Sequence, residues 1–501
     1  MKRTYKNIIA LAMTSGMLIF QSCTKNFEEI NDDPNNPADV PTSYLLTGAE
    51  KGLMDAIWDS FWGAQVGGQL AQHWSSNQYT SESRYEFRTG VTSDKWSDMY
   101  GGGTNEALFI VGGLMELQSV IEQCSNEPDK TAPYGDPNNQ IAVAKILKSW
   151  AIQMMTDTWG NIPYSEALKG TENPQPAYDN QRDIYFGLLA DVNDALSKIN
   201  DGDGPIGDVI YGGDMTQWKK FANSLKLRIA MRMSDRESSA ASTAINEAIA
   251  SGIFESNADN ALFPYTSSSP NFSLYYYNYA LDNRNDYCAS NTMVDVMNTL
   301  TDARLGSFYN VAQNSGTFVG EVYGLSEANG ASTLDQDISQ RSDRILAADF
   351  PGIYMDYAET QFILAEAVER GYIAGDAESF YNNGITASFN FWEAGDASAY
   401  IAQPNVDYST LIGAGSTWKQ VIGKQKWIAL YMQGIQGWSE YRRLDFGILQ
   451  LPADGPLSGS GIPNRLPYPV DEQTLNAASY SGAIASQGAD ALETKVWWDM
   501  N

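Results

Sequence analysis

The sequence predicts a mainly α-helical protein with little β structure, built on helix pairs of the tetratricopeptide type. Apolar residues recur at three- and four-residue steps in segment after segment, which is the period of a helix with one buried face. Short polar turns join these segments in pairs, as in helical-repeat proteins. The long stretches between the pairs lack this period and are rich in Gly, Ser, Asn, Tyr and Trp. We therefore expect a helical scaffold carrying loop-rich inserts.

Residues 1–22 have the layout of a secretory signal peptide. Lys2, Arg3 and Lys6 precede an apolar run over 8–20, and Ser22 and Cys23 follow it. The run is too short for a transmembrane helix, which needs about 20 apolar residues. A cysteine directly after a small residue is typical of bacterial lipoprotein signals, in which the sulfur receives the lipid. We predict that Cys23 is lipidated and begins the mature chain; a plain signal peptide with an unrelated cysteine is the alternative.

Residues 23–45 read as an acidic, lipid-anchored tether. The stretch 27–37, FEEINDDPNNP, is polar and rich in turn residues. Its Asp and Asn residues lack the spacing, central Gly and terminal Glu of an EF-hand loop, so Asx-turns beside the prolines explain it better. The remainder, 46–501, is predicted to be a single helical domain, and no segment after the signal is long and apolar enough to span a membrane.

The helices are predicted from stripes of apolar residues. In 141–158, Val143, Leu147, Trp150 and Met154 fall on one helical face. Gly371 stands where the C-cap of a further helix is expected. We interpret the Met and aromatic members of each stripe as core. Comparable stripes lie at 184–196, 218–233, 354–371, 380–389 and 427–435.

Four inserts of irregular sequence separate the helices, and no 34-residue repeat register survives along the chain. Long loops inside an ordered body are usually functional. The inserts lie at about 61–139, 254–350, 396–417 and 446–501.

The composition is globular but strongly acidic, with a formal net charge of −29. Nucleic-acid binding depends on Lys and Arg contacts to phosphate, so this charge argues against a nucleic-acid partner. It also argues against peripheral binding to anionic lipid headgroups. An acidic surface keeps an exported body soluble but does not identify its ligand.

The few cysteines and the single histidine exclude several kinds of site. Besides Cys23 there are only Cys124 and Cys288, without a C-x-x-C pair, so no zinc ribbon or redox pair is indicated. The two either form one disulfide or remain buried thiols. His73 is the only histidine, which rules out a multi-histidine metal site. We expect no cofactor and no metal, and no spacing argues for calcium.

Four segments resemble the SusD/RagB family of outer-membrane lipoproteins. They read TDTWGNIPYSEAL at 156–168, WKKFANSLKLR at 218–228, YAETQFILAEA at 357–367 with 381–388 behind it, and IPNRLPYP at 462–469. The stretch 27–37 is similar to the tether of the family's SusD-like branch. Four such motifs in this order behind a lipoprotein signal cover nearly all of the mature chain. We interpret the motifs as scaffold, not as ligand contacts.

The resemblance implies a fold, a location and a role. Such proteins have four tetratricopeptide-like helix pairs and a more variable ligand-binding half. They are anchored by lipid on the outside of a Gram-negative outer membrane. There they cap a SusC-like TonB-dependent barrel and hold a nutrient, often a glycan, for import.

Two inserts supply the side chains that a sugar-binding surface needs, namely aromatic rings with polar groups around them. The first is 73–79 (HWSSNQY) and the second is 271–279 (NFSLYYYNY), with 283–285 (NRN) beyond it. Aromatic packing against the scaffold is the alternative, and alternate members of an extended Tyr run face opposite sides. The candidate ligand-binding residues are Trp74, Asn77, Tyr79, Tyr275, Tyr276, Tyr277, Arg284 and Tyr323.

The leading prediction is a non-enzymatic surface protein that delivers oligosaccharide to the barrel. Oligopeptide cargo in the same import role is the alternative, which the acidic charge would favour for cationic peptides. A surface glycoside hydrolase is the rival class, because such an enzyme needs only two suitably spaced carboxylates. A third reading is an interaction protein whose ligand is held mainly by the barrel. Without a second histidine, only His73 could serve a Ser-His-Asp or Cys-His mechanism, and a lone His is more often structural.

Overall fold

The computed structural model describes residues 40–500, apart from 102–103, 106–108 and 111–112. The predicted signal peptide, Cys23 and the tether up to residue 39 lie outside this range. The first described helix, α3, spans Thr42–Ile57 and begins a few residues before the predicted start of the domain. Among the described helices, none is both long and apolar enough to cross a membrane.

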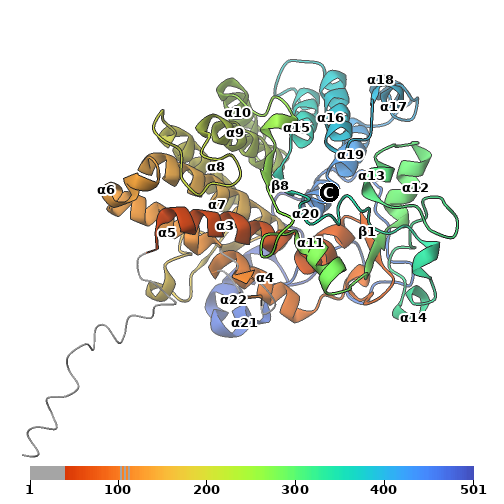
Figure 1. The fold of residues 1–501 in the computed structure, drawn as a ribbon, viewed down its shortest axis with the longest axis horizontal. Helices are drawn as coiled ribbons and strands as arrows, with labels where there is room; N and C mark the ends of the chain where they lie inside the picture. Colours follow the sequence, from red (N-terminus) through yellow and green to blue (C-terminus); the bar gives the residue numbers. More distant parts are fainter. Residues whose placement is uncertain (1–39, 102–103, 106–108, 111–112, 501) are drawn as a thin grey trace, which may run out of the picture. The chain divides into compact units, whose positions relative to one another are not determined.

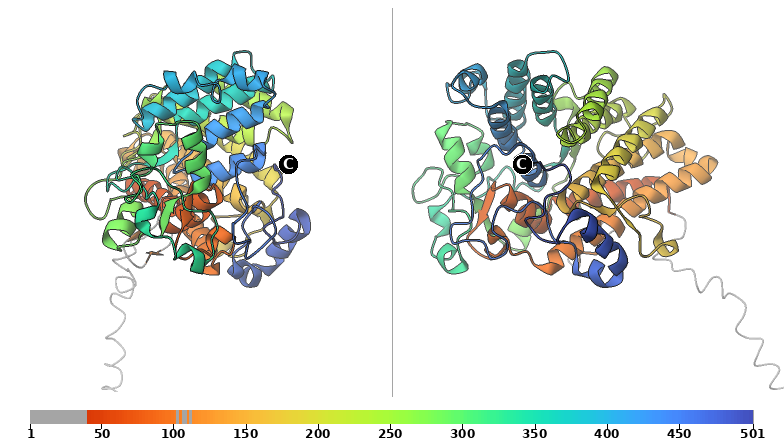
Figure 2. Two further views of the ribbon diagram at one scale, coloured as in Figure 1. Left: turned by 90° about the vertical axis from the view of Figure 1, so that its right-hand side faces the viewer. Right: turned by 180° about the vertical axis from the view of Figure 1, so that it is seen from behind.

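Antiparallel helix pairs form the scaffold, so the predicted mainly α-helical fold is confirmed. Neighbours along the chain pack on one another, notably α5 on α7, α7 on α8, α9 on α10 and α15 on α16. Figures 1 and 2 show these helices following one another around one side of the molecule. Their bounds are α5 Leu114–Asn126, α7 Pro137–Trp159, α8 Gln181–Lys198, α9 Met215–Arg232, α10 Ser238–Ser251, α15 Tyr357–Glu369, α16 Ala377–Phe391, α19 Trp418–Ala429 and α20 Gly434–Leu444.

The scaffold helices begin at polar N-cap residues, directly before the apolar positions from which the helices were predicted. The carboxylate of Asp136 accepts from the backbone N–H groups of Asn138 and Asn139, and Pro137 occupies the first turn of α7. Asp214, Asp356 and Asp376 cap α9, α15 and α16 in the same way. Such caps satisfy backbone donors that have no partner inside the helix. A part of the acidic composition therefore serves the helix starts.

One predicted helical stripe is divided between two helices. Trp427 belongs to the end of α19 and Ile435 to the start of α20, whereas Leu430 and Tyr431 lie in the turn between the helices, beside Met432 at φ +70°. The left-handed backbone at this residue turns the chain sharply, which a pattern of apolar residues does not reveal. At the other predicted end, α15 stops at Glu369 and Gly371 follows at φ +71°, as expected of a C-cap region.

The inserts contain more helix than their sequences suggested. Most of these helices are short, which explains why they show no clear period. Further helices are α4 Thr89–Gly101, α6 Pro128–Thr131, α11 Leu274–Tyr276, α12 Asn291–Thr299, α13 Leu305–Phe308, α14 Glu327–Gly330, α17 Ser398–Ile401, α18 Tyr408–Gly413, α21 Val470–Leu475 and α22 Ala477–Gln487. The π-helices are η1 Ser60–Gly68 and η6 Tyr277–Leu281, and the 3₁₀ turns are η2 Glu82–Arg84, η3 Ala132–Tyr134, η4 Gly170–Glu172, η5 Asn257–Asp259 and η7 Asp335–Asp337.

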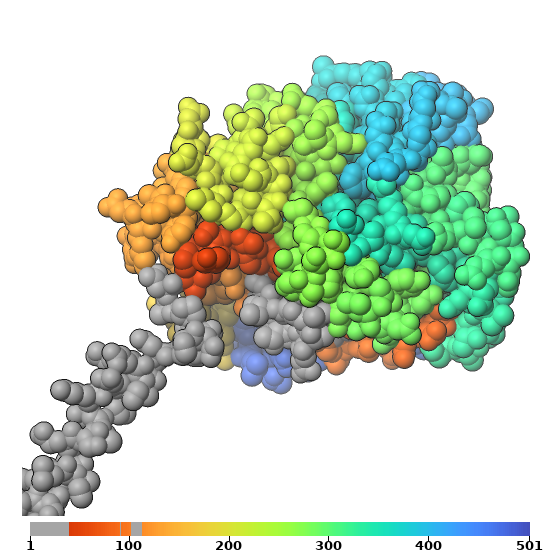
Figure 3. Space-filling model, viewed as in Figure 1, coloured from red at the N-terminus to blue at the C-terminus, as the bar shows by residue number. Residues whose placement is uncertain are grey.

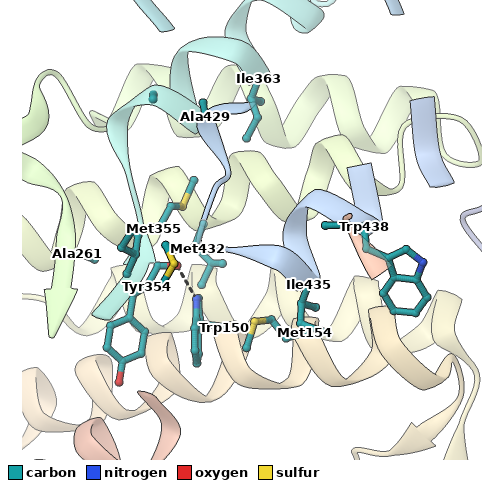
Figure 4. Close-up of a cluster of buried hydrophobic side chains, with 14 of the residues drawn as sticks. Trp150, Met154, Ala261, Tyr354, Met355, Ile363, Ala429, Met432, Ile435 and Trp438 are labelled. Carbon is teal, nitrogen blue, oxygen red and sulfur yellow. Dashed lines mark hydrogen bonds between the residues drawn. The ribbon is translucent and has the colours of Figure 1, made fainter. Parts of the chain in front are cut away.

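Several core tryptophans, Trp150 among them, combine apolar packing with a hydrogen-bonded Nε1. Trp150 of α7 packs with its ring centroid 4.5 Å from that of Tyr354 and donates from Nε1 to the Tyr354 carbonyl oxygen at 2.8 Å. Figure 4 shows Met154, Met432 and Ile435 around the same ring. Residues far apart in sequence thus share one packed centre, as the apolar stripes predicted.

Strands occur only as short antiparallel pairs in the described part of the chain. The pairs are β1 Trp74–Ser76 with β7 Tyr287–Ala289, β2 Thr104–Asn105 with β3 Phe109–Ile110, β4 Ile162–Pro163 with β5 Tyr178–Asp179, and β6 Ala261–Phe263 with β8 Gly352–Met355. The first pair matters most for the site, because it aligns Trp74 with Ala289 and Ser76 with Tyr287. It joins the two inserts that carry the candidate ligand-binding residues.

Candidate functional site

The two aromatic inserts form one side of the molecule together. β1 and β7 hold them in register, and the surface of 270–345 lies beside that of 60–90 in the space-filling view of Figure 3. Three adjoining hollows follow their junction. The main hollow has a volume of about 520 Å³, and its neighbours have volumes of about 430 and 420 Å³.

The three hollows share wall residues and therefore adjoin one another. Tyr79, Arg284 and Asp286 line both the main hollow and the second, while Gln78 and Asp335 line both the second and the third. We call the three together the groove. Its remaining lining residues are Asp59, Ser60, Phe61, Gln65, Arg88, Leu274, Tyr277, Asn278, Asp282, Asn283, Asn285, Tyr287, Asn77, Glu327, Ala331, Thr333, Leu334 and Gln336.

Aromatic rings stand open at the groove and are held by arginines. The side chain of Tyr79 is 55% exposed and that of Phe61 is 39% exposed. The guanidinium carbon of Arg284 lies 5.0 Å from the Tyr79 ring centroid, and that of Arg88 lies 5.6 Å from the Phe61 ring centroid. Cation–π contacts of this length orient a ring without burying it. The groove therefore offers fixed aromatic surfaces to a ligand.

Local backbone geometry places these rings. Phe61 projects from η1, a π-helix whose N-cap Asp59 accepts from the backbone N–H groups of Phe61 and Gly63 at 3.1 Å each. Tyr79 has φ +53°, and Asn283 on the opposite wall also has φ +53°. A left-handed backbone is unfavourable for a side chain as large as tyrosine, so the surrounding fold has to impose it. Such strain is frequent at binding sites.

Four of the predicted ligand-binding residues line the groove. Tyr79, Tyr277 and Arg284 line the main hollow, and Asn77 lines the third. Asn77 is largely buried, and its Nδ2 donates to the Asp335 carboxylate at 2.6 Å. Tyr276 is half-buried and packs on Phe272, with ring centroids 5.6 Å apart, outside the groove lining.

Trp74, Tyr275 and Tyr323 lie in the core instead. Trp74 is 2% exposed, donates from Nε1 to the Tyr431 hydroxyl at 2.9 Å and packs edge-on against Tyr275 with ring centroids 5.2 Å apart. Tyr275 and Tyr323 are equally buried. In this structure no ring face of these three residues is available for stacking on a ligand. Their rings pack inside the protein, as the alternative interpretation of the aromatic runs proposed.

Most residues of the groove were not predicted, and three of them show why. Phe61 and Arg88 lie within the first insert but outside its short aromatic run, whereas Asn278 lies inside the run 271–279 and was passed over in favour of its tyrosines. Phe61 sits beside the buried Trp62 and looks like part of a core stripe. The nearby Gly63, Gly67 and Gly68 were the available signal, because glycines inside an apolar stretch indicate an irregular turn such as the π-helix η1.

Two of the five carboxylates that line the groove are in ion pairs. The Asp286 carboxylate binds the Arg284 guanidinium at 2.5 Å, and the Asp59 carboxylate lies 2.7 Å from Lys95 Nζ. A paired, ionised carboxylate is a poor proton donor, so neither suits the general-acid role of a glycoside hydrolase. In the part of the chain that the structure describes, no group of three or more His, Cys, Asp or Glu side chains is placed to hold a metal ion.

The remaining reactive side chains are buried away from the groove. His73 hydrogen-bonds through Nε2 to the Trp427 carbonyl oxygen at 3.1 Å, and burial lowers its pKa to about 3. Cys124 and Cys288 are both free thiols, so the disulfide alternative does not apply. Glu321 lies behind the third hollow, where it accepts from the Thr333 hydroxyl at 3.1 Å, and burial raises its pKa to about 7.

Comparison with known proteins decides the family. A family model for SusD-like proteins, described as "starch-binding associating with outer membrane", matches residues 34–469. The chain belongs to the SusD-like family. The SusD/RagB resemblance of the four sequence motifs is thereby confirmed. No curated protein matches the sequence.

Solved structures of SusD-like proteins share the whole fold. A chitin-binding protein is 27% identical, with a TM-score of 0.78 over 92% of this chain and 100% of that chain. A SusD homologue from Bacteroides uniformis is 24% identical, with a TM-score of 0.78 over 92% and 100% of the two chains. A chitin-binding SusD homologue from Flavobacterium johnsoniae is 22% identical, with a TM-score of 0.75 over 91% and 99%.

Proposed function

We propose that this protein captures oligosaccharides at the cell surface and delivers them to a SusC-like TonB-dependent outer-membrane barrel. The observation that carries the proposal is the groove, which combines open aromatic rings with amide and carboxylate side chains in a member of the SusD-like family. Two structurally similar proteins are named as chitin-binding, which supports a glycan ligand.

The groove suits a chain of sugars better than a single compact molecule. Sugar rings have apolar faces, which stack on aromatic side chains, and hydroxyl edges, which bind amides and carboxylates. Phe61 and Tyr79 supply the first kind of contact, and Gln65, Gln78 and Asn278 supply the second. Because the three hollows adjoin, several consecutive sugar units can bind at once.

We infer binding without cleavage. A glycoside hydrolase requires two carboxyl groups that face each other across the ligand, one of them protonated at the working pH. Of the five carboxylates that line the groove, Asp59 and Asp286 are held as ion pairs with Lys95 and Arg284. Glu327 and Asp335 accept hydrogen bonds from the Thr80 backbone N–H and from Asn77 Nδ2, and cleavage-product analysis is the direct test for all five. Capture followed by transfer to the barrel requires only affinity.

The proposal includes a lipid anchor on Cys23. Lipidation of Cys23 would tether the body to the outer membrane through the acidic segment 23–45, and several acyl chains make such an anchor stable. Replacing Cys23 with Ser should release the protein from the membrane fraction and abolish labelling with a radioactive fatty acid. Continued labelling of the Cys23→Ser variant would contradict this attachment.

Titration calorimetry tests the binding role. Oligosaccharide panels, including chito-oligosaccharides, and an oligopeptide panel are titrated into the full chain, and the same samples are analysed for cleavage products. We expect saturable binding of a glycan without cleavage. Tyr79→Ala should weaken it several-fold or more, because the apolar face of a sugar ring loses the aromatic surface against which it is buried.

Tyr44→Ala is the matched control, since Tyr44 is 71% exposed on α3 and does not line the groove. It should bind like the wild type. Equal weakening by both substitutions would disconnect the groove from binding. Peptide binding would keep the import role and change the cargo, and cleavage of the ligand would make the protein an enzyme.

A further inference from the structure

Arg341 is a buried cation directly behind the wall of the main hollow. Its side chain is 1% exposed. Its Nη2 donates to the carbonyl oxygen of Arg284 at 3.5 Å, and its guanidinium carbon lies 5.5 Å from the ring centroid of Tyr287. Arg284 and Tyr287 both line the main hollow. One layer of side chains therefore separates this guanidinium from the proposed ligand site.

Within the described residues, nothing acidic pairs with Arg341. Its Nε and Nη1 are buried without a hydrogen-bond partner. Arg228 and Arg232 also have one such nitrogen each, but each of these buried arginines binds a carboxylate, of Glu359 and Glu440 respectively, at 2.5 Å. Burial of a charge is costly unless the charge is paired and its donors are satisfied. Accordingly, burial lowers the pKa of Arg341 below the usual arginine value.

Aromatic rings compensate the charge only in part. The guanidinium carbon lies 5.9 Å from the Trp74 ring centroid, 5.8 Å from that of Tyr279 and 5.5 Å from that of Tyr287. Ring faces attract a cation, but they do not replace the strong acceptors that the Nε and Nη1 hydrogens require. An anionic group brought by a ligand would supply them.

Tyr279 is the ring beside which such a group can approach. Trp74 and Tyr287 are both buried, whereas Tyr279 is 43% exposed. Tyr279 belongs to η6, which also contributes Tyr277 and Asn278 to the wall of the main hollow. Tyr279 itself lines none of the three hollows, so a carboxylate would reach Arg341 beside this ring, past the wall to which Tyr277 and Asn278 contribute.

We propose that Arg341 binds a carboxylate of the ligand, so that the groove recognises acidic glycans that contain uronic acid units. The proposal rests on the proposed glycan-binding function and specifies its substrate class. The arginines that line the hollow are occupied, since Arg284 pairs with Asp286 and Arg88 with Glu82. Arg341 is left as the available cation. A uronic acid carries its carboxylate along a sugar chain, so it can present this group to a cation that lies behind one wall of the groove.

The test compares an acidic ligand with its neutral counterpart. Oligogalacturonate and its methyl ester, which have the same sugar backbone, are titrated into the full chain by calorimetry. We expect the free acid to bind about tenfold more tightly or better, because hydrogen bonds between charged groups are the strong ones. Arg341→Gln should remove this preference, which is measured as the ratio of the affinities for acid and ester.

Two further variants define the role of each residue. Arg182→Gln alters an exposed arginine outside the groove and should keep the preference for the acid. Tyr279→Ala should keep the preference and accelerate association in stopped-flow measurements, because the covering ring is gone. If Arg341→Gln does not fold, Arg341→Met replaces it, because methionine keeps an apolar side chain among the rings. In either case, the wild-type affinities for acid and ester show whether the groove prefers the acid.

Different results would contradict the role of Arg341 and the proposed glycan binding on which it rests. Equal affinity for acid and ester, or an undiminished preference in the folded Arg341 variant, overturns the role of Arg341. Preference for a peptide with a free C-terminus over its amide, without any preference among the glycans, also overturns it. Binding of neutral glycans alone would leave the proposed function standing, whereas absence of binding to every glycan would remove both.

Discussion

Glu321 is a carboxyl group held in a nearly dry position behind the groove. It is 2% exposed and accepts a hydrogen bond from Thr333 at 3.1 Å. Burial disfavours the charged form and raises the pKa from 4.5 to about 7. The folded protein therefore holds a proton at pH 5–6 that the unfolded chain releases.

Glu321 should make the protein less stable as the pH rises. Its stabilising effect is complete below the unfolded pKa of about 4.5 and is lost as the pH rises through the folded pKa of about 7. Glu321→Gln cannot release a proton, so its free energy of unfolding relative to the wild type should increase by about 1 kcal/mol or more between pH 5 and pH 8. Urea unfolding at both pH values measures this difference.

The exposed Glu172 on η4 provides the control. Glu172→Gln should follow the wild type at both pH values. An unchanged gap between Glu321→Gln and the wild type from pH 5 to pH 8 would show that Glu321 does not titrate in this range.

Single side chains also set the limits of the scaffold helices. Asp214 ends an extended segment, and its carboxylate accepts from the backbone N–H groups of Thr216 at 2.8 Å and Gln217 at 3.2 Å. α9 then packs against α10, α8 and α15. Because α9 lies among these neighbours, a defect at its start affects more than one helix pair.

Asp214→Ala should lower the free energy of unfolding by about 1 kcal/mol, the usual cost of losing an N-cap. Chemical denaturation followed by circular dichroism measures the change. Asp201→Ala, in the exposed loop before α9, is the control and should stay within about 0.5 kcal/mol of the wild type. A neutral Asp214→Ala would mean that packing alone defines the start of the helix.

A network of buried charges connects helices from both ends of the scaffold. Glu366 of α15 binds Arg443 of α20, with each of its two oxygens 2.5 Å from a guanidinium nitrogen. Arg443 also binds Glu440, which in turn binds Arg232 of α9 at 2.5 Å. Arg232 reaches Asp157 of α7 at 3.1 Å. Four helices that are distant in sequence therefore depend on one another for charge compensation.

Removing one charge from this network should be strongly destabilising. Glu366→Gln leaves Arg443 and Arg370 without that carboxylate in a buried site, and we expect a loss of roughly 3 kcal/mol or more. Urea unfolding measures it. Glu255→Gln, which removes the 74% exposed partner of Lys220, should cost less than about 1 kcal/mol.

The same network should limit stability in acid. Burial by itself would raise the pKa of Glu366, but the Arg443 guanidinium lowers it below the ordinary value. The stabilising effect is therefore present above pH 4.5 and is lost as the pH falls through the lowered pKa. A Glu366→Gln loss as small as that of Glu255→Gln would contradict this role of the network.

Much of the fold follows from local pattern. A helix with one buried face repeats its apolar residues at a period that is visible in the sequence, and Asp136, Asp214, Asp356 and Asp376 mark helix starts by satisfying local backbone donors. The division of 427–435 at Met432 was not visible, because a left-handed turn at one residue leaves the apolar pattern intact.

The sequence by itself determined the helical class, the family motifs and the two inserts that form the groove. Only the tertiary structure decided which aromatic rings stay open. Trp74 and Tyr79 lie five positions apart in one insert, yet Trp74 is enclosed by Tyr275, Tyr287 and Tyr431 while Tyr79 faces the groove. Burial of a ring depends on partners that are brought to it from hundreds of residues away, and no local pattern of residue types specifies those contacts.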